Sequence, residues 1–323
     1  MSSGPILITG GTGFIGAEIV RMLLAAGEEE IHVLHRRGNF QRLEDVLERV
    51  NPIQIDLADG PRLGEVVAET RPRAIYHLGA ILTGPGEENP QAATVANAFG
   101  TYALLEAARR HEVNQFLFAS SVGVYGAGIT EDVITDLTLQ RPFTIYGITK
   151  VFGEQLGNYY KQKYGLDFRG LRYPSIVGPG VTTPSVVQFT SWVIEECARG
   201  KPFAITVTPE TAVAVMYYKD AARAMIQLGE APVEKIATVN YLVDGVKPTP
   251  TAGKLAEIVR SRIPQAQISF EPNAILQPAI DQVARPIDDR RARTEWSWEP
   301  AYDQEAIVDD FLAELREHPE RYR

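Results

Sequence analysis

The chain of 323 residues contains a single cysteine, Cys197, and only five histidines. One thiol can neither close an internal disulfide nor supply a cysteine-rich metal site, which is typical of a protein from a reducing compartment. The histidines show no paired spacing of the kind that metal ligands adopt. We therefore expect neither disulfides nor a bound metal.

Positive charge and long apolar runs are also scarce. The chain has 32 Lys and Arg against 41 Asp and Glu, a formal net charge of −9, which is the wrong sign for binding nucleic acid or an anionic membrane. No apolar stretch approaches the roughly 18 residues of a membrane-spanning helix, and the N-terminus has no secretion signal. We expect a cytoplasmic protein that binds neither nucleic acid nor membranes, in which any basic site is local.

The first 174 residues alternate β-rich runs with helical patterns. Strands are predicted at residues 6–9, 31–34, 53–55, 74–78, 115–119 and 170–173, and helices at 18–26, 63–69, 93–111 and 145–164. Such alternation predicts an α/β fold with a parallel sheet covered by helices on both faces. After residue 174, prolines and glycines cluster, and a helix at 186–199, short strands at 204–207 and 238–243 and further helices follow. This change of composition predicts a second, smaller unit over the carboxyl edge of the sheet.

A glycine-rich turn joins the first strand to the first helix. Gly10, Gly13 and Gly16 recur every three residues, a spacing that permits a tight turn and brings the backbone close to a pyrophosphate at the positive end of a helix. Three glycines alone can form a plain turn. Their place between a strand and a helix, at the start of a βαβ pattern, predicts dinucleotide binding.

The residues at the end of the second strand bear on the choice of cofactor. An acid there would bind a ribose 2′-hydroxyl, but the chain has His35, Arg36 and Arg37. Guanidinium groups suit a 2′-phosphate. We expect NAD(P), with a preference for NADP; the alternative is a basic turn that simply faces solvent.

Tyr146 and Lys150 lie four residues apart in a predicted helix, so both can point into one cleft. A nearby cation lowers the pKa of a tyrosine, as a general base at neutral pH requires. Ser120 and Ser121 follow the strand at 115–119, and a hydroxyl at that position can donate to a developing oxyanion. Tyr-x-x-x-Lys alone is common on helix surfaces, but here it follows a glycine-rich turn and a strand-end serine.

These motifs, in this order, resemble the extended short-chain dehydrogenase/reductase family over nearly the whole chain. Supporting matches are Asp56-Leu57, the segment 77–80, Asn97 and Arg172-Tyr173-Pro174. The resemblance implies a Rossmann doubly wound parallel sheet in an NAD(P)-binding domain of residues 1–174, completed by 213–245. It also implies a smaller C-terminal α/β substrate lobe at 175–323 and a homodimer formed by helices such as 93–111 and 145–164.

The resemblance also implies roles for individual residues. Tyr146 is the proton acceptor, Lys150 holds the nicotinamide ribose and lowers the pKa of Tyr146, and Ser121 orients the reacting oxygen with help from Ser120. Cofactor contacts are expected at Gly10, Gly13, Phe14, Ile15, Gly16, His35, Arg36, Arg37, Asp56, Leu57, Leu78, Gly79, Ala80, Asn97, Tyr146, Lys150, Tyr173, Pro174 and Ile176.

Within the family, the chain looks most like the short-chain L-threonine dehydrogenases, through segments that include 86–90, 216–218 and 287–289. This likeness implies substrate contacts at Thr83, Ser120, Ser121, Ser175, Thr182 and Thr183. The chain departs from that group at His35, in a shorter loop at 178–180, and at Arg285-Pro286, where the group has Trp-Pro. Arg285 can serve as an anion clamp for the substrate, or it is an ordinary surface charge.

We predict an oxidoreductase that oxidises a secondary alcohol of a small hydroxylated substrate, threonine-like or a hydroxy acid, by hydride transfer to NAD(P). A nucleotide-sugar 4-epimerase is the alternative, although no basic residue that could bind a diphosphate precedes Lys219 in segment 213–219. A non-catalytic dinucleotide sensor is a third possibility, and the intact Ser121, Tyr146 and Lys150 argue against it.

Overall fold

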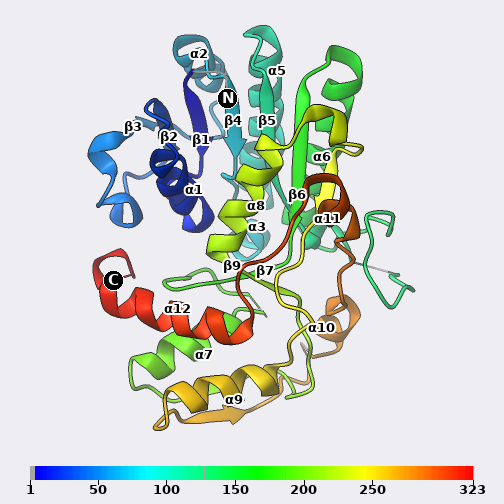
Figure 1. Cartoon of the computed structure of the whole chain (residues 1–323). Helices are drawn as coiled ribbons and strands as arrows, with labels where there is room; N and C mark the ends of the chain where they lie inside the picture. Colours follow the sequence, from blue (N-terminus) through cyan, green and yellow to red (C-terminus); the bar gives the residue numbers. More distant parts are fainter. Residues whose placement is uncertain (1–3, 127, 186, 276, 323) are drawn as a thin grey trace.

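A central sheet of seven parallel strands organises the computed structural model, which describes residues 4–126, 128–185, 187–275 and 277–322 (Figure 1). The strand order is β10–β6–β5–β4–β1–β2–β3. The strands are β1 (Ile6–Thr9), β2 (Ile31–His35), β3 (Asn51–Gln54), β4 (Ala74–His77), β5 (Gln115–Ser121), β6 (Asp167–Tyr173) and β10 (Asn240–Leu242). The order reverses between β1 and β4, which is the switch point of a doubly wound sheet. The predicted Rossmann-type α/β fold is confirmed.

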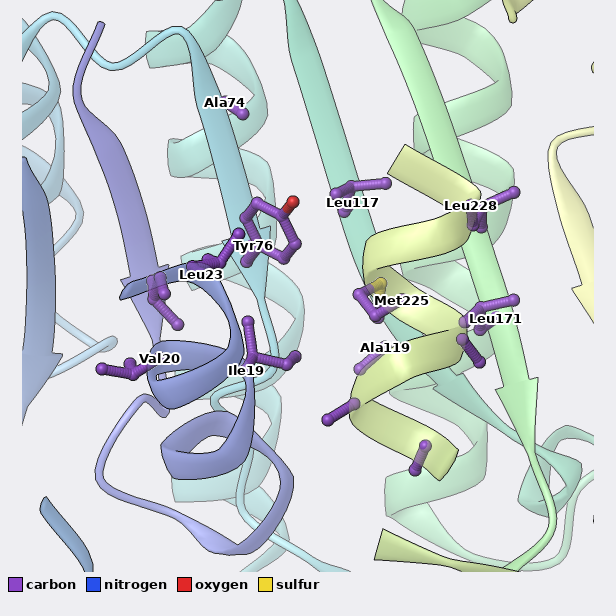
Figure 2. Close-up of a cluster of buried hydrophobic side chains, with 14 of the residues drawn as sticks. Ile19, Val20, Leu23, Ala74, Tyr76, Leu117, Ala119, Leu171, Met225 and Leu228 are labelled. Atoms are coloured by element: carbon purple, nitrogen blue, oxygen red, sulfur yellow. The ribbon is translucent and has the colours of Figure 1, made fainter. Parts of the chain in front are cut away.

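Helices cover both faces of this sheet. Alternation along β1 sends Ile6 and Ile8 to one face and Leu7 to the other. The first face is covered by α1 (Phe14–Ala25) and α8 (Tyr218–Glu230), and the second by α2 (Gly60–Thr70), α5 (Gly100–Arg110) and α6 (Ile145–Tyr164). Figure 2 shows side chains of α1 and α8 packed over the middle strands. Burial on both faces explains why the central strand β1 is apolar along most of its length.

The C-terminal lobe lies at the carboxyl edge of the sheet (Figure 1). Its strands form two parallel pairs, β7 (Ser175–Val177) with β9 (Val215–Tyr217) and β8 (Phe203–Ile205) with β11 (Ile268–Phe270). Its larger helices are α7 (Phe189–Ala198), α9 (Ala252–Arg262) and α12 (Gln304–Glu317). They share a core of their own, to which Val193, Leu255 and Phe311 contribute.

The remaining elements are short. They are α3 (Thr83–Glu88), α10 (Gln277–Val283), α11 (Arg290–Trp296), and the 3-10 helices η1 (Gln41–Leu43), η2 (Leu47–Arg49), η4 (Val122–Val124), η5 (Val233–Lys235) and η6 (Pro319–Tyr322). No helix in the described ranges is long and apolar enough to cross a membrane.

Several element boundaries differ from the sequence predictions. The helix expected over 93–111 starts as α4 (Pro90–Ala93), passes through the π-helical segment η3 (Thr94–Phe99) and ends as α5. The strand expected at 53–55 is β3 at 51–54, because β3 pairs with β2 from Asn51 onward. The first helix begins at Phe14 rather than at residue 18, because the chain turns into it directly after Gly13. The N-terminal residue of the predicted helix 186–199 lies outside the described residues.

The segment 213–245, expected to complete the sheet, divides between two sheets. β10 joins the central sheet beside β6, whereas β9 pairs with β7. The domain boundary at residue 174 stays a prediction.

Candidate active site

The glycine-rich turn has a backbone that only glycine accommodates at two positions. Gly10 has a φ of +70°, and a Cβ there would lie 2.8 Å from the amide nitrogen of Gly79. A Cβ on Gly16 would lie 2.2 Å from the carbonyl oxygen of Gly10. Helix α1 then starts after Gly13 with no side chain capping its first amides. The turn therefore offers an uncapped, positively polarised helix end, which fits the pyrophosphate of a dinucleotide.

A cavity of about 340 Å³ opens beside this turn, at the carboxyl ends of β1, β2 and β4. Its lining brings together residues from distant parts of the chain, among them Gly10, His35, Arg36, Asp56, Leu57, Gly79 and Ala80, all predicted to contact the cofactor. Thr183, predicted to contact substrate, also borders it. The loop after β7 therefore reaches the same cavity as the glycine-rich turn.

The other predicted cofactor contacts are not part of the described lining of that cavity. They are Gly13, Phe14, Ile15, Gly16, Arg37, Leu78, Asn97, Tyr146, Lys150, Tyr173, Pro174 and Ile176. The Tyr173 hydroxyl donates to the carbonyl oxygen of Ala221 on α8, at 2.8 Å, and its side chain is buried. The Tyr173 side chain thus packs between the sheet and α8 and does not face the cleft. Leu78 and Ile176 likewise pack against the hydrophobic core on that face.

The basic segment after β2 is accessible. Arg36 and Arg37 are exposed, and Arg36 borders the cavity. His35 is held in place, because its Nδ1 accepts a hydrogen bond from the amide of Gly38 at 3.0 Å and its ring meets Phe40 edge-on at 4.6 Å. Partial burial lowers the pKa of His35. The Arg36 guanidinium and a neutral imidazole therefore border this end of the cavity, and Arg37 is exposed at the next position of the chain.

Ser121, Tyr146 and Lys150 come together, as predicted. Ser121, at the end of β5, lies close enough to Tyr146 to lower the pKa of the tyrosine, and it accepts a bond from the amide of Gly123 at 3.0 Å. The Lys150 Nζ lies 5.5 Å from the centre of the Tyr146 ring. The strand end and the first turns of α6 therefore hold a serine, a tyrosine and a lysine in one small region.

The pKa of Tyr146 corrects one expectation. Burial raises it to about 12, and the nearby Ser121 hydroxyl opposes this rise. Burial also lowers the pKa of Lys150 to about 8, against the attraction of Glu154. The sequence predicted that Lys150 lowers the pKa of Tyr146; instead the ammonium binds the Ala119 carbonyl oxygen, so desolvation dominates the tyrosine.

A buried chain of hydrogen bonds lies beneath the cleft, and the family resemblance pointed only to its histidine. His77 contacts Thr9 through Nδ1 at 2.7 Å and Thr101 through Nε2 at 2.9 Å. Thr101 donates to the carbonyl of Asn97, so it accepts from His77, and the imidazole carries its proton on Nε2. Thr9 then donates to Nδ1 and accepts from the amide of Gly79. Burial lowers the pKa of His77 to about 3 and keeps the ring neutral.

Asn97, predicted to contact the cofactor, clamps the backbone of the cavity wall. Its side-chain amide accepts from the amide of Ile81 at 2.7 Å and donates to the carbonyl of the same residue at 2.9 Å. It also donates to Thr149 on α6 at 3.2 Å. Asn97 therefore ties the loop after β4 to the helix that carries Tyr146 and Lys150.

Ser120 lies elsewhere than the substrate-contact prediction implied. It is 2% exposed, and its hydroxyl donates to Glu154 Oε1 at 2.5 Å. Alternation along β5 explains this, because Ser120 shares the α6-facing side of the strand with Phe116 and Phe118. The sequence reasoning missed Glu154, although its position one helical turn after Lys150 was a usable signal.

The remaining predicted substrate contacts are spread around the mouth of the site. Thr83 begins α3, Ser175 begins β7, and Thr182 is exposed beside Thr183. Backbone hydrogen bonds lower the pKa of Glu131, and the charge of Arg285 acts in the same direction. No group of metal-ligating side chains that could hold an ion occurs among the residues described.

The sheet order and the cavity at the switch point define an enzyme of the dinucleotide-binding α/β class. The chain belongs to the NAD dependent epimerase/dehydratase family, whose model matches residues 6–243. It is 32% identical over 313 residues to the mitochondrial L-threonine 3-dehydrogenase of Sus scrofa, covering 95% of this chain and 81% of that protein.

Solved structures give the same grouping. An L-threonine dehydrogenase from Clostridium difficile superposes with a TM-score of 0.89 at 28% identity, covering 98% of this chain and 99% of the other. A monomeric L-threonine 3-dehydrogenase from a metagenome superposes with a TM-score of 0.86 at 25% identity, covering 97% and 99%. The predicted family membership is confirmed, and the chain is a nicotinamide-dependent enzyme.

Proposed function

We propose that the enzyme oxidises a secondary alcohol of a small hydroxylated substrate, L-threonine-like or a hydroxy acid, with NAD(P) as the acceptor. The observation that carries the proposal is the convergence of Ser121, Tyr146 and Lys150 beside a dinucleotide-sized cleft. The similarity to proteins named L-threonine 3-dehydrogenase supports the choice of substrate class.

The proposed roles follow from position and chemistry. The nicotinamide, when bound, supplies the carbon that accepts hydride. Ser121 donates a hydrogen bond to the substrate oxygen, and Tyr146, once ionised, takes the hydroxyl proton as the carbonyl forms. The Lys150 ammonium stabilises the ionised tyrosine and binds the ribose hydroxyls. Thr83, Ser175, Thr182, Thr183 and Arg285 remain proposed substrate contacts.

A substrate panel tests the proposal. Purified enzyme is mixed with L-threonine, hydroxy acids or UDP-sugars, and the absorbance of reduced nicotinamide is followed with NAD and NADP separately. We expect reduction with a small hydroxy compound and its loss in Tyr146→Phe, with cofactor affinity nearly unchanged. An active Tyr146→Phe enzyme would refute the role of Tyr146.

The segment where a nucleotide-sugar diphosphate would need a cation does not supply a free one among the described residues. Lys219, in the first turn of α8, is bound by Asp310 at 2.7 Å and by Glu314 at 2.8 Å. Freeing it for a diphosphate would break both ion pairs. We therefore do not favour epimerase activity.

We infer a preference for NADP from the basic segment after β2. Arg36 borders the cavity, and Arg37 is exposed at the next position. No acidic residue stands at positions 35–37, where one would bind a ribose 2′-hydroxyl. We expect Arg36→Ala to weaken NADP binding about tenfold and NAD binding little, measured by fluorescence titration. Equal NAD and NADP affinity in the native enzyme would reject this preference.

We also infer a homodimer. Phe99 and Tyr102 on the η3–α5 side, and Ile148, Phe152 and Tyr159 on α6, are large side chains at least 40% exposed, more apolar surface than two solvated helices need. One structural relative is described as monomeric, so the test is direct. Light scattering should give twice the chain mass, and Phe152→Glu should give the monomer.

A cytoplasmic location stays a prediction, testable by cell fractionation.

A further inference from the structure

Three side chains of α6 hold three consecutive residues at the end of β5. Tyr146 lies beside Ser121, which lowers the pKa of the tyrosine, and Lys150 donates to the carbonyl oxygen of Ala119. Glu154 then accepts the hydroxyl hydrogen of Ser120. The helix residues are spaced by four and so lie along one face. Each of the first three turns of α6 therefore contributes one contact to the end of β5. Of the three helix residues, only Glu154 was not among the predicted catalytic residues.

The Glu154 carboxylate is buried and forms an ion pair inside the protein. Glu154 is 0% exposed. Arg172 binds it with both arms of the guanidinium, Nε to Oε1 at 2.9 Å and Nη2 to Oε2 at 2.6 Å. Gln140 adds a further bond at 2.5 Å. A buried charge is unfavourable unless it is paired in this way, and this chain carries one directly behind the catalytic side chains.

Strands β5 and β6 both contact Glu154. Ser120 on β5 is the cross-strand partner of Arg172 on β6, so Glu154 binds both members of one pair from above the sheet. Ser121 follows immediately, where β5 leaves the sheet and enters η4. The position of Ser121 therefore depends on the residue before it being held.

We propose that Glu154 is a positioning residue for the reaction. The Glu154 carboxylate is held by Arg172 and binds the Ser120 hydroxyl. In this way Glu154 fixes the end of β5 and places the Ser121 hydroxyl against Tyr146. This inference rests on the proposed function, because the serine and tyrosine act there on the substrate oxygen.

Glu154 has a second, electrostatic effect on Lys150. Its negative charge raises the pKa of Lys150 and opposes the effect of burial. The other groups around this lysine are the Tyr146 ring at 5.5 Å, the neutral His77 of β4, and Arg172, which is bound to Glu154. Removing the carboxylate therefore lowers the pKa of Lys150 below about 8, and less of the lysine is protonated at neutral pH.

Two variants and a matched control test the proposal. Ser120→Ala removes one hydrogen bond and leaves the Glu154–Arg172 pair intact, and Glu154→Gln removes the charge. Asp167→Asn is the control, because Asp167 pairs with Arg169 at 2.7 Å at the opposite end of β6. We expect kcat to fall about tenfold in Ser120→Ala and about a hundredfold in Glu154→Gln, with the KM for cofactor within about twofold. Values within about twofold of Asp167→Asn would overturn the proposal.

A readout independent of turnover separates this proposal from the proposed function. Protein carrying 13C-labelled lysine is titrated by NMR, and the Lys150 signal is identified by its loss in Lys150→Met. We expect Glu154→Gln to lower the pKa of Lys150 by about one unit, and Asp167→Asn to leave it unchanged. An unchanged Lys150 pKa in Glu154→Gln contradicts the electrostatic effect even if no substrate is found, whereas an inactive native enzyme contradicts only the proposed reaction.

Discussion

Lys150 donates a hydrogen bond to the backbone oxygen of Ala119, with 2.6 Å between Nζ and the oxygen. The bond holds the ammonium at the strand end, beside the Phe118 ring at 4.8 Å. Because burial lowers the pKa of Lys150 to about 8, its charge is lost just above neutral pH. The site therefore depends on pH through its lysine as well as through its tyrosine.

The first prediction concerns that charge. Oxidation needs Tyr146 ionised and Lys150 protonated. Because the pKa of Tyr146 is about 12 and that of Lys150 about 8, the population of this form rises with pH up to about 8 and then levels off, and kcat/KM should do the same. Lys150→Arg carries a charge that does not titrate in this range, so its residual activity should go on rising above pH 8. Rates measured from pH 6 to 10 check this, and Lys150→Met should lose about a hundredfold or more of kcat. A levelling near pH 8 that persists in Lys150→Arg would assign it to another group.

The second prediction concerns stability and His77. In the folded protein its pKa is lowered from the ordinary 6.5 to about 3 by burial. Below pH 6.5 the His77 imidazole therefore binds a proton in the unfolded chain but not in the folded chain. As a result, the free energy of unfolding falls as the pH drops toward 3. Urea titrations between pH 4 and 7 should show a shallower slope in His77→Gln than in the native protein. Equal slopes would contradict a neutral buried His77.

The third prediction compares two glycines. Gly16→Ala places a methyl group 2.2 Å from the Gly10 carbonyl oxygen, so it should distort the turn and weaken cofactor binding at least tenfold. Gly64→Ala in α2 meets nothing within 4 Å and should stabilise the helix by about 0.5–1 kcal/mol. Isothermal titration with cofactor and thermal melting measure the two effects. A Gly16→Ala protein with native affinity would reject the turn as the pyrophosphate site.

The fourth prediction concerns the junction of the lobe with α1. The Arg42 guanidinium lies over the rings of Phe14 and Tyr322, at 5.2 and 5.5 Å, and donates to the Gly180 carbonyl at 2.5 Å. Arg42→Ala should lower the free energy of unfolding by about 2 kcal/mol and weaken cofactor binding, since Phe14 opens α1. The exposed Arg316→Ala on α12 is the control, expected to change stability by less than about 0.5 kcal/mol. Denaturant titration compares them, and equal losses would contradict a special role for Arg42.

Local patterns were sufficient for part of the site. The alternation of strands and helices predicted a parallel sheet covered by helices on both faces, and the spacing of Gly10, Gly13 and Gly16 predicted a turn into a helix. Tyr146 and Lys150 share a helix face because helical spacing requires it. These features depend on neighbours in sequence, so the sequence carries them directly.

Other parts depended on residues far apart in the chain. His77 bonds to Thr9 on β1 and to Thr101 on α5, and β10 joins beside β6 although β9, which is closer to β6 in sequence, does not. Ser120 and Ser121 are identical side chains, and only the pleat of β5 sends one to Glu154 and leaves the other beside Tyr146.

The sequence by itself determined the class of fold, the glycine-rich turn into the first helix and the shared helix face of Tyr146 and Lys150, because each rests on local spacing. The tertiary structure decided their ionisation. Burial, which no spacing reveals, raises the pKa of Tyr146 to about 12 and lowers that of Lys150 to about 8, and the ion pair of Glu154 with Arg172 lies behind them.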